Sequence, residues 1–286
     1  MRRRHLGDTG LTFFPVGLGA MPLSVAGRPD EARALETLAA ALEAGVDFID
    51  TANVYCLDDA DLGHNERLVA KAVKASGRKG VLIATKGGLA RPEGRWVNDA
   101  RPAFLRESVE KSLKALGTDA IGLYQLHAPD PKVPLEDSVS ELKRLQEEGK
   151  IVHIGLSNVD EEELERALKV SRVETVQNRC NPFRGEDYSG TMLVTCLARR
   201  VTYLPYGVVG GHRGQSKVGD HPLLKEIARA HGASPYAVTV AWHLAQGPAV
   251  LPIPGASRPA SILDSVSAAA LTLSEGEVDA ITALGA

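Results

Sequence analysis

The chain has 286 residues, of which 44% are hydrophobic and 24% are charged, with a formal net charge of -3 and an isoelectric point near 6.3. This length and hydrophobic content are typical of a globular protein that buries one large core or two smaller ones. The slightly acidic balance provides no basic surface for nucleic acid, and no apolar stretch reaches the roughly 18 residues that a membrane span requires. The opening MRRRHLGDTG is unlike a secretory signal, so we expect a cytoplasmic protein without nucleic-acid or membrane partners.

Turn signals near the amino terminus precede the first apolar run. Gly7-Asp8 and Thr9-Gly10 lie between two short strand-like pieces, which predicts a β-hairpin within residues 2–13. Eight short apolar runs bounded by turn residues then follow, and most are almost continuously apolar, as is typical of parallel strands covered on both faces. They span residues 14–20, 45–50, 81–86, 120–127, 150–157, 173–178, 201–206 and 249–254.

Helical patterns with recognisable ends separate these runs. The predicted helix starts share a capping side chain, and the predicted ends share a glycine that can adopt a positive φ. The starts are Asp30, Asp160 and Ser234, and the ends are Gly45, Gly117 and Gly149. Strand and helix therefore alternate along the chain.

Alternation of this kind, without a central linker, predicts an α/β fold of the (β/α)8 TIM-barrel type, in which residues 1–286 form a single domain. The amino-terminal hairpin would close the barrel floor. An open doubly wound sheet is the alternative, but GLGAMP has Pro22 where the dinucleotide fingerprint needs its third glycine. Because eight strand-helix units also exceed what most open sheets use, the barrel is preferred.

Polar side chains end the predicted strands, and in such a barrel the carboxyl ends of the strands form the active site. Each residue alone has a structural explanation, such as a turn cap, a rim aromatic or a core histidine. Together they are expected to converge on one mouth. They are Asp50 and Tyr55, Lys86, His127, Ser157-Asn158, and Gln177-Asn178.

The types of four of these side chains are complementary. A free phenol has a pKa of about 10, and a nearby ammonium favours the phenolate. Lys86 can supply that charge to Tyr55, and Asp50 can keep the buried ammonium paired. His127 can then orient a carbonyl group or relay a proton. This set predicts a tuned proton donor.

Seven segments, taken in order, resemble the aldo-keto reductase family. They are DTANVY, IATKGG, LYQLHAPDP, GKIVHIGLSN, VQNRCNP, YLPYG and LPIPGAS. The resemblance implies an NADP-dependent oxidoreductase that reduces an aldehyde or ketone to an alcohol, with hydride transfer from NADPH and Tyr55 as proton donor. Lys86, Asp50 and His127 would support Tyr55.

The resemblance also implies a set of cofactor-binding residues. Ser157, Asn158 and Gln177 would hold the nicotinamide carboxamide, and Tyr203 would stack on the nicotinamide ring. Gly19, Ala20 and Met21 would line the mouth of the first strand. The remaining residues of the cofactor segments are Leu204, Tyr206, Gly207, Ile253, Gly255, Ala256, Ser257, Arg258, Asp264 and Ser265.

Two segments depart from the family pattern. Asp264-Ser265 stand where many members have Glu-Asn, and Ser261 replaces a frequent arginine, so Arg258 is expected to bind the 2'-phosphate, with NADH less favoured. In YCLDDADLGHNE, several residues separate Tyr55 from Gly63 where the family often continues directly, so this insertion is expected to reshape the substrate rim.

Other chemistry has weaker support in the sequence. Three cysteines without C-x-x-C spacing predict neither disulfides nor a zinc site, and His64 with Glu66 is too small a set for a metal. Lys86 could instead form a Schiff base in an aldolase. The same fold could also serve as a cofactor-sensing regulatory subunit. The sequence predicts neither the carbonyl substrate nor the oligomeric state.

Overall fold

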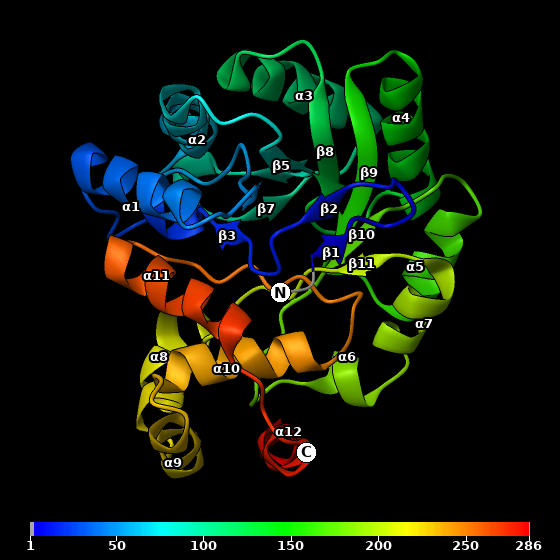
Figure 1. The fold of residues 1–286 in the computed structure, drawn as a ribbon. Helices are drawn as coiled ribbons and strands as arrows, with labels where there is room; N and C mark the ends of the chain where they lie inside the picture. Colours follow the sequence, from blue (N-terminus) through cyan, green and yellow to red (C-terminus); the bar gives the residue numbers. More distant parts are fainter. Residues whose placement is uncertain (1–2, 286) are drawn as a thin grey trace.

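A seven-stranded parallel sheet curls through the centre of the computed structural model, which describes residues 3–285 apart from the side chains at positions 212, 213 and 215 (Figure 1). The strand order is β11-β10-β9-β8-β5-β4-β3, so each strand lies beside its predecessor along the chain except for the small hairpin inserted after β5. The strands are β3 (Leu18–Gly19), β4 (Phe48–Asp50), β5 (Leu82–Gly87), β8 (Ile121–Leu126), β9 (Ile151–Ser157), β10 (Thr175–Gln177) and β11 (Thr202–Tyr203).

An extended segment at residues 249–255 closes the curl between β11 and β3. On one side, Leu251 N donates to Tyr203 O at 2.9 Å; on the other, Gly19 N donates to Pro254 O at 3.0 Å. Pro252 and Pro254 have no N–H to return toward β3, which explains why this eighth segment is not a regular strand. At Gly19, a Cβ would lie 2.8 Å from Ile253 O, so only glycine allows this approach. The predicted (β/α)8 barrel is confirmed.

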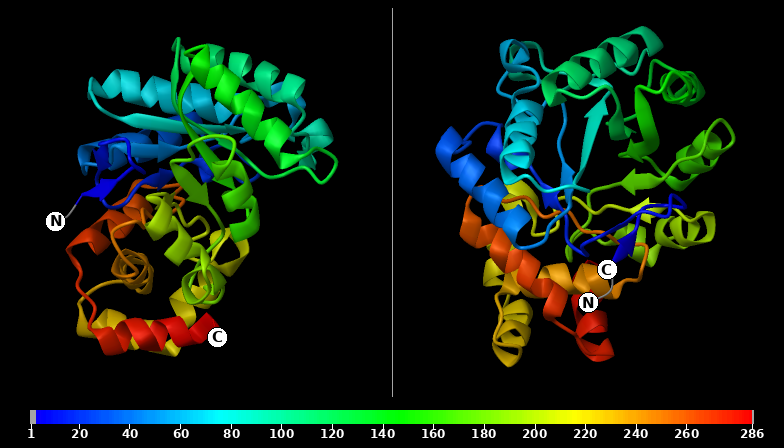
Figure 2. Two further views of the ribbon diagram at one scale, coloured as in Figure 1. Left: turned by 90° about the vertical axis from the view of Figure 1, so that its right-hand side faces the viewer. Right: turned by 45° about the horizontal axis from the view of Figure 1, so that its top comes forward.

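Helices surround the sheet on its outer side (Figure 2). The predicted caps are confirmed: Asp30 accepts from Arg33 N, Asp160 forms a capping box with Glu163, and Ser234 accepts from Ala237 N. In the described part of the chain, no helix has the length and apolar character to cross a membrane. The helices are α1 (Glu31–Glu43), α2 (His64–Ser76), α3 (Pro102–Leu116), α4 (Leu135–Glu147), α5 (Glu161–Leu168), α6 (Glu186–Ser189), α7 (Met192–Arg199), α8 (Gly211–Asp220), α9 (Pro222–Ala230), α10 (Pro235–Ala245), α11 (Pro259–Ser267) and α12 (Glu275–Thr282).

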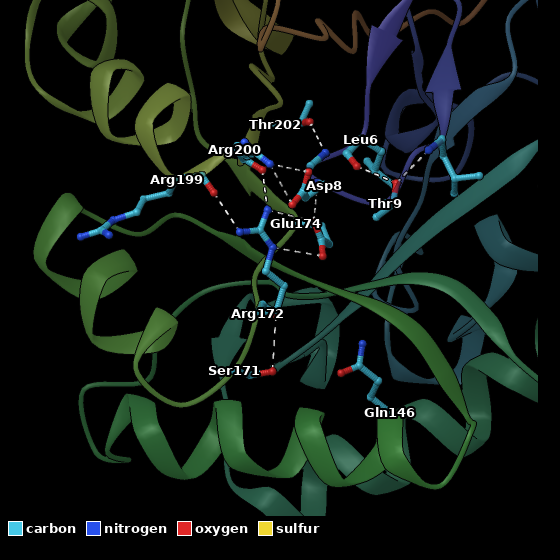
Figure 3. Close-up of polar contacts among 12 residues, drawn as sticks. Leu6, Asp8, Thr9, Gln146, Ser171, Arg172, Glu174, Arg199, Arg200 and Thr202 are labelled. Carbon is cyan, nitrogen blue, oxygen red and sulfur yellow. Dashed lines mark hydrogen bonds and ion pairs between the residues drawn. The ribbon is translucent and has the colours of Figure 1, made fainter.

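The amino-terminal hairpin, formed by β1 (Arg4–His5) and β2 (Thr12–Phe13), lies across the amino ends of the barrel strands. Its turn is fixed by polar contacts, because Gly7 N donates to Thr202 Oγ1 at 2.7 Å and Asp8 N donates to Glu174 Oε2 at 3.0 Å (Figure 3). Leu6 is fully buried and packs into the apolar barrel interior. The hairpin therefore closes the floor as predicted, and only the opposite, carboxyl-end mouth is left for a site.

Candidate active site

The paired strands β4, β5 and β8 bring the first polar side chains to one place at the mouth. Asp50 is the last residue of β4 and pairs with Ala84 of β5, while Lys86 pairs with Gln125 of β8. Tyr55 follows β4 in a tight turn, in which Tyr55 N donates to the Ala52 carbonyl at 3.1 Å. Asp50 and Gln125, which are 75 positions apart in the sequence, therefore share one cluster.

The Lys86 ammonium is the centre of this cluster. Its Nζ donates to Asp50 Oδ2 at 2.6 Å, to the Thr51 carbonyl at 3.0 Å and to the Tyr55 hydroxyl oxygen at 2.9 Å. Lys86 is 0% exposed, and all three of its N–H donors have acceptors. The ammonium thus touches the phenol on one side and a carboxylate on the other, in the arrangement that the sequence predicts.

Two glutamines complete the environment of Asp50. Gln177 Nε2 donates to Asp50 Oδ1 at 2.8 Å, and Gln125 Nε2 donates to the same oxygen at 3.1 Å. Gln125 is not among the residues predicted from the sequence. The signal for it in the sequence is a polar residue two positions before His127, on a strand whose other inward-facing residues are apolar. Both glutamines fix the carboxylate that faces Lys86.

Burial largely determines the protonation of Tyr55 and Lys86. The pKa of Tyr55 is raised well above 10.0, mainly by desolvation and further by the Asp50 charge. The pKa of Lys86 is lowered by desolvation, against the opposing effect of Asp50. The prediction that the nearby ammonium favours the phenolate is therefore wrong for this site, because desolvation and the Asp50 charge raise the pKa of the phenol. Tyr55 holds its proton at neutral pH.

His127 lies on the other side of Tyr55, with the two ring centroids 5.7 Å apart and the rings nearly perpendicular. Burial and the Lys86 charge hold the pKa of His127 well below 6.5, so the imidazole is neutral. Its Nδ1 is buried without a hydrogen-bond partner among the described residues. Nε2 is therefore the ring nitrogen that a carbonyl oxygen can reach, and it donates to such an oxygen in the Nε2–H tautomer.

The turn at residues 63–66 supports the mouth from behind. Asn65 is fully buried, donates to the Ala20 carbonyl at 2.8 Å and accepts from Thr51 Oγ1 at 2.5 Å. Glu66 accepts from Thr85 Oγ1 at 2.6 Å, next to Lys86. Asn65 is not among the residues predicted from the sequence, because its partners are remote along the chain.

The residues expected around the nicotinamide lie at the ends of β9 and β10. Asn158 is exposed, has a positive φ of 58°, and donates to the His127 carbonyl at 2.9 Å and to Ser157 Oγ at 3.1 Å. Gln177 is 2% exposed and turned toward Asp50. Asn178 points away from the mouth, donating to the Val159 carbonyl at 2.8 Å and to Asp187 Oδ2 at 2.9 Å. Of this group, Asn158 is the member open to solvent.

The two tyrosines of YLPYG point in different directions. Tyr203 is 0% exposed, packs in the core on the helical side of β11, and donates its hydroxyl hydrogen to Asp187 Oδ2 at 2.6 Å. Tyr206 is partly exposed, and its hydroxyl donates to Asn158 Oδ1 at 2.8 Å. Leu204 lies in the barrel interior between them, and Gly207 follows with a φ of 63°. The structure thus brings Tyr206, and not Tyr203, to the mouth.

The segments expected near the rest of the cofactor meet where the barrel closes. Gly19 forms a parallel bridge with Gly255, and Ala20 and Met21 follow directly, with Ala256 buried behind them. Ser257 and Arg258 are exposed just before α11, and Arg258 Nε donates to Ser261 Oγ at 3.1 Å.

Asp264 and Ser265 are held by contacts within the protein. Asp264 Oδ2 accepts from Ser234 Oγ at 2.6 Å, and the Ser265 hydroxyl donates to the Ser261 carbonyl at 3.1 Å. Arg258 is therefore the charged side chain of this region that faces solvent. Among the side chains that the structure describes, no group of three or more His, Cys, Asp or Glu could hold a metal ion.

Comparison with known proteins identifies the family. The model of the aldo/keto reductase family matches residues 15–286. The uncharacterized oxidoreductase C215.11c of Schizosaccharomyces pombe is 34% identical over 265 residues, which are 91% of this chain and 82% of that protein. The aldo-keto reductase YhdN of Bacillus subtilis is 36% identical over 210 residues, which are 72% of this chain and 62% of that protein.

Solved structures agree with this family. The glycerol dehydrogenase AKR11B4 of Gluconobacter oxydans has a TM-score of 0.86 at 26% identity, covering 99% of this chain and 94% of that chain. The thermostable aldo-keto reductase Tm1743, solved with the inhibitor epalrestat, has a TM-score of 0.85 at 31% identity, with both chains fully covered (100%). The chain belongs to the aldo-keto reductase family, and the family supports an oxidoreductase acting on small-molecule carbonyl compounds.

Proposed function

We propose that this enzyme reduces an aldehyde or ketone to an alcohol with NADPH, and that Tyr55 donates the proton. The contact that carries the proposal is the buried chain Tyr55–Lys86–Asp50, with distances of 2.9 and 2.6 Å. A protonated phenol beside a paired ammonium at the barrel mouth is suited to general acid catalysis, which contributes typically about 10²- to 10⁴-fold. The proposal takes residues 1–286 as one barrel domain.

The proton transfer follows from the pKa directions at the site. The raised pKa of Tyr55 keeps the phenol protonated, so it can donate to a carbonyl oxygen that becomes negative during reduction. The phenolate left behind would lie against the Lys86 ammonium, which stabilises negative charge far better in a buried site than in water. Neutral His127 would hold the same oxygen in position through a hydrogen bond from its accessible Nε2. Lys86 therefore stabilises the phenolate that proton transfer produces more than it stabilises the starting phenol.

The residues at the mouth fit a nicotinamide dinucleotide. Gly19 and Gly255 let the segments at the barrel closure pack closely, because a side chain at either position would collide with Ile253 O or the Pro22 ring. Tyr206 presents its aromatic ring beside the polar Asn158 amide, a pairing that suits stacking together with carboxamide binding. When bound, the cofactor supplies the hydride. We assign the stacking role to Tyr206 in place of Tyr203.

Preference for NADPH over NADH rests on Arg258. Its side chain is exposed at the start of α11, whose first N–H groups have no side-chain cap. A helix amino terminus and a planar guanidinium both favour a phosphate group. The Asp264 carboxylate accepts a hydrogen bond from Ser234 at the start of α10. The 2'-phosphate of NADPH is therefore expected at this corner.

Tyr55→Phe tests the proposal most directly. We expect the variant to bind NADPH with unchanged affinity, measured by fluorescence quenching, while turnover of aldehydes falls by about 10²-fold or more. Tyr236→Phe is the matched control, since that partly buried tyrosine lies on α10 and is expected to change neither quantity. Near-normal turnover of Tyr55→Phe would overturn the assignment.

The aldolase alternative receives no support from the position of Lys86. All three donors of its ammonium are engaged by Asp50, Thr51 and Tyr55, and a Schiff base would have to break those contacts. Borohydride trapping of a carbonyl compound on Lys86 without nicotinamide would show the aldolase reaction. For the regulatory-subunit alternative, NADPH binding without turnover across a broad panel of aldehydes, ketones and sugars would be the expected outcome.

A further inference from the structure

A small hairpin follows Lys86 and packs over the inserted loop after Tyr55. It consists of β6 (Leu89–Ala90), a short turn at η3 (Pro92–Gly94) and β7 (Val97–Asn98). At Gly94, whose φ is 76°, a Cβ would lie 3.0 Å from the Leu57 carbonyl, so the hairpin tip rests directly on the insertion. The hairpin and the insertion therefore form one wall beside the mouth.

Arg91 is the residue that joins the two parts of this wall. Its Nη2 donates to the carbonyls of Cys56 and Leu57, each at 3.0 Å. Its guanidinium carbon lies 4.0 Å from the centroid of the Trp96 ring. Arg91 is only 6% exposed, and among the described residues it has no ion pair with a carboxylate. A buried guanidinium with these partners is held by carbonyls and an aromatic face.

Trp96 extends from Arg91 toward the proposed catalytic residues. Its ring centroid lies 6.4 Å from that of Tyr55 and 6.3 Å from that of His127, in edge-to-face arrangements. The side chain is nevertheless 48% exposed. An indole that is half open to solvent would ordinarily move, so the Arg91 contact is the restraint that keeps it beside Tyr55.

We propose that Arg91 is a positioning residue that determines substrate specificity, because it holds Trp96 as a fixed aromatic wall of the carbonyl pocket. The class of substrate so favoured is an aldehyde or ketone with a flat apolar substituent, such as an aromatic ring. A wall that is already ordered binds such a group without the entropy loss of ordering a mobile indole. Small aliphatic carbonyl compounds reach Tyr55 and His127 without needing the wall. This inference rests on the proposed carbonyl reduction.

The first test measures the wall itself and needs no activity. The chain has two tryptophans, and Trp242 is fully buried, so acrylamide quenching in the native protein reports mainly on Trp96. Arg91→Met keeps the apolar stem and removes the charge and the donors. Since a 48% exposed ring can at most about double its accessible surface, we expect the quenching constant of the Trp96 component to rise by up to about 2-fold.

Controls make this result specific. Arg95→Met, on the same hairpin, removes an exposed arginine that pairs with exposed Glu93, and should leave quenching unchanged. Trp96→Phe assigns the quenched component, and the unquenched Trp242 emission reports whether each variant is folded. Should Arg91→Met fail to fold, Arg91→Lys retains the charge but not the planar fork and should give an intermediate increase. Unchanged quenching in the folded variant would overturn the proposal.

The second test measures specificity. With NADPH, the ratio of kcat/KM for benzaldehyde to kcat/KM for propanal should fall roughly 2- to 30-fold in Arg91→Met, which is the range of a lost cation–π restraint. The change should appear in KM for benzaldehyde more than in kcat. An unchanged ratio overturns the specificity role. If the wild-type enzyme reduces no carbonyl compound, the proposed function fails, whereas the quenching result still decides whether Arg91 restrains Trp96.

Discussion

Lys86 Nζ lies 2.6 Å from Asp50 Oδ2, and both side chains are almost fully withdrawn from solvent, at 0% and 3% exposure. Surface ion pairs contribute little to stability, but a buried charge that loses its partner is strongly destabilising. The pair therefore links the fold to the proposed chemistry, since the same carboxylate that keeps the ammonium charged also holds it against Tyr55.

Asp50→Asn should expose this dependence. Removal of the carboxylate charge leaves the Lys86 ammonium buried and unpaired, so we expect the free energy of unfolding to fall by about 3–5 kcal/mol and turnover to fall with it. Urea denaturation followed by circular dichroism measures the first quantity. Glu31→Gln, which breaks an exposed pair with Lys71, should change stability far less. Equal effects of the two substitutions would argue against the buried pair.

Tyr203 and Tyr206 should separate stability from cofactor binding. Tyr203→Phe removes a buried hydrogen bond to Asp187, so we expect a loss of about 1–3 kcal/mol in the free energy of unfolding and an unchanged Kd for NADPH. Tyr206→Ala removes the exposed ring and should weaken NADPH binding roughly 3- to 10-fold with little effect on unfolding. The opposite pattern would return the stacking role to Tyr203.

Arg258→Ala should change the choice of cofactor. Loss of a charge-assisted contact to the 2'-phosphate is expected to raise the Kd for NADPH roughly 10- to 100-fold and to leave the Kd for NADH nearly unaltered. Fluorescence titration with both dinucleotides measures this directly. A parallel loss of affinity for both would show that Arg258 contacts a part of the cofactor that they share.

His243 should make stability depend on pH. The residue is fully buried, its Nδ1 lies 2.6 Å from the Tyr188 hydroxyl, and desolvation lowers its pKa from 6.5 to about 3. Since the folded pKa lies below the unfolded one, the unfolded chain binds more protons between these values. The free energy of unfolding should therefore fall as pH falls through this window, with His243 contributing ~1.4 kcal/mol per pH unit.

His243→Gln isolates that contribution. The amide can still bond the Tyr188 hydroxyl but cannot take up a proton, so the free energy of unfolding should change between pH 6 and 5 by about 1.2 kcal/mol less than in the wild type. Buried His127 contributes in the same direction and is unchanged in both proteins. Identical slopes in the two proteins would mean that His243 is already protonated in the folded state.

The amino-acid sequence by itself determined the order of strands and helices, the helix caps and the floor hairpin. These features depend on contacts between residues close in the chain, such as Asp160 with Glu163, and on apolar runs that can be read locally. The positions of Asp50, Tyr55, Lys86 and His127 at or just after predicted strand ends also indicated one shared mouth, because the carboxyl ends of all barrel strands meet there.

The tertiary structure alone decided how those groups are surrounded. Gln177 meets Asp50 across 127 positions, Arg91 meets Trp96 and the insertion, and Tyr206 rather than Tyr203 turns toward the mouth. Successive side chains of a strand point to opposite faces, so a shift of one residue moves a tyrosine from the mouth to the core. The protonation state of Tyr55 could likewise not be predicted from the sequence. The desolvation that raises its pKa exists only once the barrel has closed around it.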